Sequence, residues 1–204
     1  MPEFGSRDPL TPAFWDERFE RDFTPWDRGA APQVLHTFVA RNDRPLRTLI
    51  PGCGKAWELV HLCEAGWPAT AIDFSPAAVA QAKELAGQWA DHIELADFFA
   101  WQPPHELDFI YERAFLCALP PAMWEKVAAR WAELLPAGAL LGGFFYFDPA
   151  AGKRGPPFAT TPEALHALLD PYFELIEELA VADSIPIFAG KERWMVWQRR
   201  TSTS

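Results

Sequence analysis

The amino-acid sequence predicts an α/β fold in which a mostly parallel sheet carries helices on both faces. The first observation is that strand-like apolar runs alternate with segments of helical spacing along much of the 204 residues. Such alternation is typical of parallel strands linked by crossover helices. The second is a tight glycine turn between the first strand and the first of these helices. The third is that the last two strand-like runs lack a helix between them, which predicts a hairpin with an antiparallel last strand.

The elements follow one another in a simple order. Apolar runs predict strands at residues 46–50, 69–74, 93–98, 107–112, 139–147, 173–180 and 193–198. Apolar spacing predicts helices at 56–65, 76–89 and 121–135, and a later helix beginning after Thr161-Pro162. The second of these helices should begin cleanly, because Ser75 can cap it and Pro76 suits a first turn. A loop rich in Pro and Gly, at 148–157, separates the last helix from the fifth strand.

A glycine turn and an acidic residue together predict a nucleoside site. Gly52 and Gly54 follow the first strand, and Asp73, 21 residues after Gly52, ends the second. Glycine lets a ligand approach the backbone, and a carboxylate can accept hydrogen bonds from both ribose hydroxyls. Nucleoside cofactors are held in this way, with the two features about 20 residues apart. A plain turn followed by a helix cap is the alternative.

The same turn favours S-adenosyl-L-methionine over NAD. A dinucleotide fingerprint needs a third glycine, where close packing admits a pyrophosphate. Trp57 occupies that position and is too large for such an approach. S-adenosylmethionine has no phosphate, so a glycine turn and an acidic ribose contact are enough. Its product after methyl transfer would be S-adenosyl-L-homocysteine.

The ends of the third and fourth strands add three candidates. In an open α/β sheet the ligand lies beyond the carboxyl ends of the strands. Asp97 there can accept from an adenine amino group while Phe98 packs on the ring. Arg113 is a cation that would favour an anionic or thiolate acceptor. The alternatives are a loop carboxylate for Asp97 and a surface salt bridge with Glu112 or a neighbouring acid for Arg113.

Composition excludes several other classes of protein. The formal charge of −10 disfavours a nucleic-acid partner, which would need a basic face. No apolar run is long enough to cross a membrane, and no signal-peptide core is recognisable. The three cysteines lack pairing motifs and indicate reduced thiols in a cytoplasm. Cys53 and Cys117 fit buried packing positions better than nucleophiles, and the five scattered histidines predict no metal site.

A single domain is expected over residues 1–204, with a flexible tail at 1–12, a lid segment at 13–45 and the α/β core at 46–200. The lid is dense in aromatic residues. Trp15 and Phe19 are four apart, as are Phe19 and Phe23, so one helical face should carry all three. Simple packing on the sheet would bury that face. We favour rings that face a sulfonium, where cation–π attraction operates.

Several motifs, taken together, resemble the thiopurine S-methyltransferase superfamily, which includes the plant and bacterial halide/thiol methyltransferases. The most specific are Thr-Pro-Trp-Asp at 24–27, Pro-Gly-Cys-Gly-Lys at 51–55 and Gly-Pro-Pro-Phe at 155–158. The resemblance covers nearly everything from Phe14 to Arg199. It implies a seven-stranded, Rossmann-like class I methyltransferase fold, with an N-terminal helical lid that closes over S-adenosylmethionine.

The resemblance also implies roles for individual residues. Aromatic side chains of the lid would line the cofactor site: Trp15, Phe19 and Trp26. Gly52 would contact the methionine end and Asp73 the ribose, while Asp97 and Phe98 would contact the adenine. Arg113 would lie between cofactor and acceptor and take part in catalysis. Phe19 departs from the halide/thiol branch, which usually has Trp there; the ring remains but the donor is lost.

The acceptor stays open, because the chain mixes features of two branches. Arg113 after Glu112 is similar to the thiopurine branch, whereas Ile-Pro-Ile-Phe-Ala-Gly-Lys-Glu-Arg at 185–193 is similar to the halide/thiol branch. We expect a monomer that methylates a small thiol or thiolate. Halide, thiocyanate, or O- or N-methylation by the same fold are alternatives, as is a non-catalytic cofactor-binding protein. The chain retains Gly52, Asp73, Asp97 and Arg113 together. This complete set favours an enzyme over a protein that only binds the cofactor.

Overall fold

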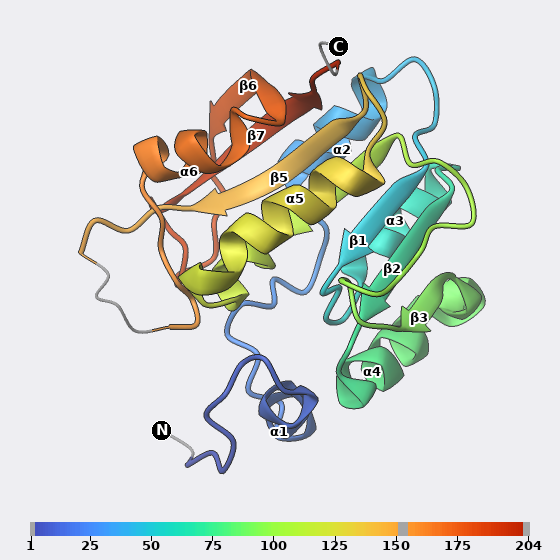
Figure 1. Ribbon diagram of the computed structural model, residues 1–204. Coiled ribbons are helices and arrows are strands. Elements are labelled where there is room, and N and C mark those ends of the chain that lie inside the picture. Colours follow the sequence, from blue (N-terminus) through green and yellow to red (C-terminus); the bar gives the residue numbers. More distant parts are fainter. Residues whose placement is uncertain (1–2, 151–154, 202–204) are drawn as a thin grey trace.

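The computed structural model describes residues 3–150 and 155–201. Their centre is a seven-stranded sheet in the order β3-β2-β1-β4-β5-β7-β6 (Figure 1). The strands are β1 (Thr48–Pro51), β2 (Ala69–Asp73), β3 (Ile93–Leu95), β4 (Phe109–Arg113), β5 (Leu140–Tyr146), β6 (Phe173–Ala180) and β7 (Glu192–Arg199). Strands β1 to β5 pair in parallel, and β7 runs antiparallel between β5 and β6. The predicted α/β class and the antiparallel last strand are confirmed.

Helices cover both faces of this sheet (Figure 1). They are α1 (Pro12–Glu20), α2 (Gln33–Arg41), α3 (Trp57–Glu64), α4 (Pro76–Ala86), α5 (Trp124–Leu134) and α6 (Pro162–Leu169). Apolar side chains of α5 and α6 form one core with Leu49 and Ile110. Those of α2, α3 and α4 form a second core with Ile50 and Phe109. Adjacent strand residues thus serve opposite cores, as the two-residue period of a strand requires.

Some predicted boundaries are wrong for identifiable reasons. The helix expected at 76–89 ends at Ala86 because Gly87 takes a φ of 55°, and a 3₁₀ turn (Gly87–His92) follows. The helix expected at 121–135 divides into a 3₁₀ turn (Pro121–Met123) and α5. The strand expected at 93–98 stops at Leu95, and Asp97 then accepts a hydrogen bond from the Phe99 amide in a tight turn.

The lid segment also differs from the sequence expectation. Helix α1 ends at Glu20 and Asp22 takes a φ of 51°, so Phe23 is not on the helical face of Trp15 and Phe19. Helix α2 was not predicted. Residues before α1 lie against it: the Ser6 amide donates to Glu17, and the ring centroids of Phe4 and Phe23 are 5.3 Å apart. Over the described residues, no helix combines the length and apolarity needed to span a membrane.

Candidate active site

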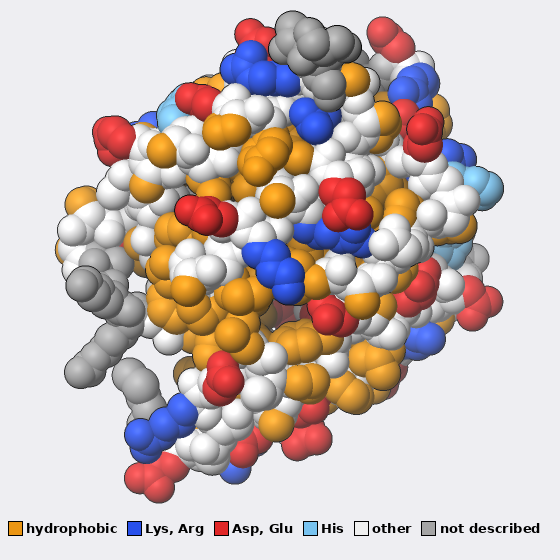
Figure 2. Space-filling view, viewed as in Figure 1, with side chains coloured by type: hydrophobic (Ala, Val, Ile, Leu, Met, Phe, Trp, Pro, Cys, Tyr) orange, Lys and Arg blue, Asp and Glu red, His pale blue; other side chains and the backbone are white. Residues whose placement is uncertain are grey.

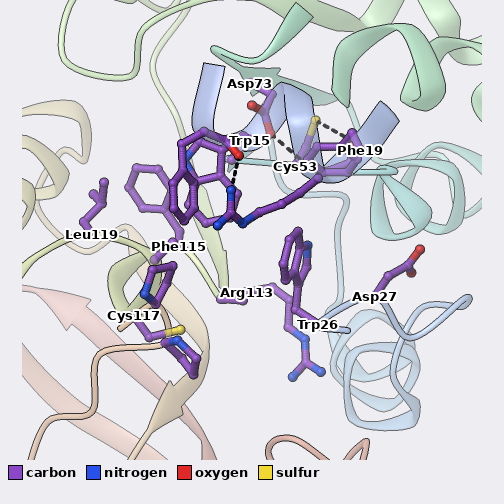
Figure 3. Close-up of a pocket in the computed structure, with 18 of the residues that line it drawn as sticks. Trp15, Phe19, Trp26, Asp27, Cys53, Asp73, Arg113, Phe115, Cys117 and Leu119 are labelled. Carbon is purple, nitrogen blue, oxygen red and sulfur yellow. Dashed lines mark hydrogen bonds between the residues drawn. The ribbon is translucent and has the colours of Figure 1, made fainter. Parts of the chain in front are cut away.

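A cavity of about 880 Å³ lies at the carboxyl ends of the parallel strands, below the lid. Its volume is within the range of about 300–1,000 Å³ usual for small-molecule sites. Every site residue predicted from the sequence lines it: Trp15, Phe19, Trp26, Gly52, Asp73, Asp97, Phe98 and Arg113. Apolar side chains gather around a hollow in the face seen in Figure 2. Figure 3 shows the aromatic, acidic and basic side chains around the cavity.

The glycine turn is shaped by the protein's own rings as well as by any ligand. Gly52 and Gly54 have φ values of 59° and 52°, which favour glycine. A Cβ on Gly52 would lie 2.6 Å from Cδ2 of Phe115, a contact too short to exist. A Cβ on Gly54 would be 3.6 Å from Cζ of Phe19. Phe115 therefore explains why position 52 must be glycine, and the sequence pattern did not identify it.

Asp73 joins the glycine turn to the next helix. One carboxylate oxygen accepts from the Gly54 amide at 3.1 Å, and the other accepts from the Ser75 amide at 2.9 Å. Burial raises the pKa of Asp73 to about 6, although these backbone hydrogen bonds oppose the shift. A carboxylate has about four lone-pair sites, so two remain for hydroxyl donors. The side chain is thus fixed in place and still able to bind a ribose.

The lid supplies a cluster of perpendicular rings. The centroids of Trp15 and Trp26 are 5.5 Å apart at 81°, and those of Phe19 and Trp26 are 6.0 Å apart at 75°. Edge-to-face contacts at such distances are favourable. The indole of Trp15 is oriented by its hydrogen bond to the Pro9 carbonyl at 2.8 Å. These rings form one wall of the cavity (Figure 3).

Three hydrogen bonds attach α1 to the start and body of α4, next to which it lies in Figure 1. Asp16 accepts from the Ser75 hydroxyl at 2.6 Å and from the Ala77 amide at 3.0 Å. This places a carboxylate at the N-terminus of α4, where the helix dipole favours negative charge. Gln81 of α4 donates to the Phe19 carbonyl at 2.8 Å. The lid helix is therefore held by the same helix that Asp73 and Ser75 begin.

The chain after α1, which we call the strap (residues 21–32), contributes several residues to the lining of the cavity. Asp27 accepts from the indole nitrogen of Trp57 at 2.9 Å and pairs with Lys55 at 3.1 Å. Arg28 pairs with Asp183, in the loop between β6 and β7, at 2.6 Å. From the sequence, Trp57 was interpreted only as a residue that disfavours NAD. The structure shows that its indole also binds the strap.

The predicted adenine side of the cavity follows β3. Asp97 is exposed and accepts from the Phe99 amide at 2.9 Å. Phe98 is buried, with its ring centroid 5.0 Å from that of Phe115 at 70°. The two adjacent residues thus present a free carboxylate edge and a fixed ring to the cavity, as an adenine amino group and ring would require.

The opposite end of the cavity contains a buried ion pair. Arg113 Nη1 lies 2.8 Å from Glu192 Oε2, and the two side chains are 10% and 3% exposed. The guanidinium carbon is 4.2 Å from the ring centroid of Phe144 and 5.5 Å from that of Phe188. The alternative of a surface salt bridge with Glu112 or a neighbouring acid is right about an acidic partner but wrong about the location, because the pair with Glu192 is buried. Burial alone would lower the pKa of Arg113, but the surrounding carboxylates and Tyr111 raise it overall.

Glu112 binds backbone amides, whereas its neighbour Arg113 pairs with a carboxylate. One of its oxygens accepts from the Phe115 and Leu116 amides, both at 2.9 Å. It thereby holds the turn that places the Phe115 ring over Gly52. Burial raises the pKa of Glu112 to about 7, against the effect of these backbone donors.

Other lining residues were not predicted as site residues. They include Phe115, Leu119, Met123, Pro156, Pro157, Ile187 and Phe188, together with the two cysteines. Cys53 and Cys117 are buried, and burial raises the pKa of both thiols, so neither favours the reactive thiolate. Glu192 lies 79 residues after Arg113. Residues 151–154 of the predicted loop lie outside the described residues.

Comparisons with known proteins place this geometry among methyltransferases. A sequence model of the thiopurine S-methyltransferase family matches residues 10–200. Thiocyanate methyltransferase 1 of Arabidopsis thaliana is 30% identical, over 91% of this chain and 84% of that protein. Thiopurine S-methyltransferase of Shewanella piezotolerans is 28% identical, over 90% of this chain and 93% of that protein.

Solved structures agree at the level of the fold. The 1,6-didemethyltoxoflavin-N1-methyltransferase of Burkholderia thailandensis, solved with S-adenosylhomocysteine, has a TM-score of 0.75 and 17% identity, covering 93% of this chain and 87% of that one. A TehB-like methyltransferase from Corynebacterium glutamicum has a TM-score of 0.67, covering 93% of this chain and 100% of that one. At 17% and 16% identity these similarities concern the fold.

Proposed function

Because this chain belongs to the thiopurine S-methyltransferase family and is an S-adenosylmethionine-dependent methyltransferase, we propose that it methylates the sulfur of a small, readily ionised thiol. The observation that carries the proposal is the reacting end of the cavity. A guanidinium is present there, and no histidine is among the described residues that line the cavity. Such a site suits a nucleophile that ionises without a strong general base.

We assign the cofactor to the cavity by the positions of its polar groups. Asp73 would accept from the ribose hydroxyls, and Asp97 with Phe98 would hold the adenine. The methionine end would cross the turn at Gly52, directing the sulfonium toward Arg113. The rings of Trp15, Phe19 and Trp26 would face the sulfonium, whose positive charge a ring face attracts.

Methyl transfer then needs alignment more than acid–base chemistry. The thiol proton leaves to solvent, and a sulfur lone pair forms the new S–CH₃ bond as the C–S bond of the sulfonium breaks. S-adenosylhomocysteine and a neutral thioether remain, so the positive charge of the cofactor disappears. Holding both reactants in line and excluding water can supply much of the rate. Arg113 would hold the reacting sulfur in position for the transfer.

The compartment is part of the same proposal. Cys53, Cys63 and Cys117 are all free and buried. Unpaired buried thiols are typical of proteins in a reducing environment. We therefore place the enzyme in the cytoplasm.

A matched set of acceptors tests the proposal. Thiophenol, phenol and aniline differ only in the nucleophilic atom, so labelled S-adenosylmethionine should methylate thiophenol and leave the other two nearly unmodified. The products are separated by chromatography and identified by mass. Methylation of phenol or aniline at a rate similar to that of thiophenol would contradict a sulfur-directed site.

A further inference from the structure

The ion pair at the acceptor end has a fixed geometry. Glu192 is the first residue of β7, and strand pairing sets it opposite Tyr146 of β5. Arg113 is the last residue of β4, opposite Phe144 of β5. Both charged side chains therefore extend from paired strands on the two sides of β5, and neither depends on a mobile loop for its place.

The guanidinium also has little freedom to turn away from its partner. The rings of Phe144 and Phe188 lie within 5.5 Å of its carbon atom, and Arg113 is only 10% exposed. A buried arginine that lost its carboxylate would be left uncompensated, which is costly. The pair should therefore persist when cofactor and acceptor bind.

The pair leaves hydrogen-bonding capacity unused. Within the described part of the chain, neither Arg113 Nη2 nor Glu192 Oε1 has a hydrogen-bond partner. Both atoms are buried, and Arg113 lines the cavity whereas Glu192 is not among the described lining residues. An acceptor would therefore meet the guanidinium, and Glu192 can affect that acceptor only through Arg113.

The charge balance of the pair favours acceptors that arrive neutral. Arg113 is the cation on the β4 side of the cavity, and Glu192 offsets it at 2.8 Å. The other ionisable groups that shift the pKa of Arg113, namely Glu58, Tyr111 and Glu112, contribute no further positive charge. A permanent anion would lose its hydration on entering this site and find little net attraction. A thiol enters neutral and avoids that cost.

We infer that Glu192 sets the acceptor class, by neutralising Arg113 so that the site accepts thiols that arrive protonated and disfavours permanent anions such as thiocyanate and iodide. Glu192 acts through Arg113 and is a specificity-determining positioning residue. This inference rests on the proposed thiol methylation and narrows it to one class of sulfur acceptor.

The test compares two acceptors in Glu192→Gln, which keeps the size of the side chain and removes its charge. The KM for thiocyanate should fall at least about tenfold, because an uncompensated guanidinium attracts an anion strongly in a site of low dielectric constant. The kcat/KM for methanethiol, an alkyl thiol that arrives protonated at neutral pH, should change less, so the ratio of the two efficiencies shifts toward thiocyanate. The KM for S-adenosylmethionine should stay unchanged.

Two further variants serve as controls. Glu178→Gln breaks the exposed ion pair between Glu178 of β6 and Arg193 of β7. This variant should leave the ratio of the two efficiencies as it is in the parent. Glu192→Asp retains the charge and should retain the preference for thiols. An unchanged ratio in Glu192→Gln, with methanethiol still methylated, would overturn the inference alone. Failure of all thiols in the parent would overturn the proposed function instead.

Folding of the variant is checked by its thermal transition and by calorimetric binding of S-adenosylhomocysteine. If Glu192→Gln does not fold, the inference can still be tested on the parent enzyme by comparing two KM values. Its KM for thiocyanate should exceed its KM for methanethiol, an acceptor of similarly small size that can arrive protonated. A lower KM for thiocyanate would contradict the inference.

Discussion

At the scale of single residues, the site depends on carboxylates whose burial disfavours their charged form. Asp73 and Glu112 each accept backbone hydrogen bonds that shape a turn, and burial raises the pKa of each. Such shifts concentrate where a protein must keep a charged group available to a ligand. Both residues therefore give pH-dependent predictions.

Cofactor affinity should depend on the ionisation of Asp73. The pKa of about 6 means that the free protein binds a proton there as pH falls, and the protonated carboxyl is a poorer acceptor for the ribose. Calorimetry with S-adenosylhomocysteine should show affinity falling below pH 6. Asp73→Asn should weaken binding by roughly 1.5–3 kcal/mol per lost charged hydrogen bond and abolish the pH dependence.

Asn is preferred to Ala in this experiment because it can still accept one backbone hydrogen bond at the turn. Asp170→Asn, at the exposed end of α6, is the matched control and should bind as the parent does. Unchanged affinity in Asp73→Asn would remove the ribose role from this residue.

Stability should depend on pH through Glu112. The folded pKa of about 7 exceeds the ordinary 4.5, so the stabilising effect of protonation is complete below about 4.5 and disappears as pH rises through 7. The unfolding free energy should fall by up to roughly 3 kcal/mol over that window. Glu112→Gln should lack this slope above pH 6, where Asp73 contributes little. Urea titrations at several pH values measure it, and an equal slope in both proteins would contradict the assignment.

At the scale of elements, the lid depends on contacts with parts of the core that are distant in sequence. Helix α1 is bound to the N-terminus of α4, and the strap is bound to Lys55, Trp57 and the β6–β7 loop. A lid that closes over a ligand should be easier to open when the ligand is absent.

Trypsin cleavage at Arg28 tests this behaviour. Adding S-adenosylhomocysteine should slow it markedly, because Trp15 and Trp26, which both precede Arg28 in the lid, would pack on the ligand. Asp183→Asn, which weakens the pair with Arg28, should accelerate cleavage of the free protein. Cleavage at Arg200 provides an internal control that the ligand should not alter. Equal cleavage rates at Arg28 with and without ligand would mean that the rings of Trp15 and Trp26 only pack within the protein and do not contact the ligand.

At the scale of the whole molecule, local sequence patterns predicted the sheet and most of its helices. Period-two and helical spacing, with glycine and proline at the boundaries, are local signals and sufficed for β1 to β7. Helix α2 was missed because its N-cap position is occupied by Pro32, which has no capping side chain. The division at Pro121 and the early end at Gly87 depend on backbone angles that the apolar pattern does not show.

The site was predicted unevenly for a related reason. Gly52 and Asp73 belong to a motif of fixed spacing, so the sequence alone identified them. Phe115 over Gly52 and Glu192 beside Arg113 arise from contacts between distant segments, which no local pattern encodes. Glu192 belongs to the motif at 185–193, one residue before the expected strand at 193–198, but that motif did not reveal its partner.

A crystal structure with S-adenosylhomocysteine tests the central claim most directly. We expect the ligand in the cavity below the lid, with its ribose hydroxyls on Asp73, its adenine between Asp97 and Phe98, and its sulfur facing Arg113. The pair between Arg113 and Glu192 should remain intact. A ligand bound outside this cavity, or a ribose that does not contact Asp73, would contradict the account.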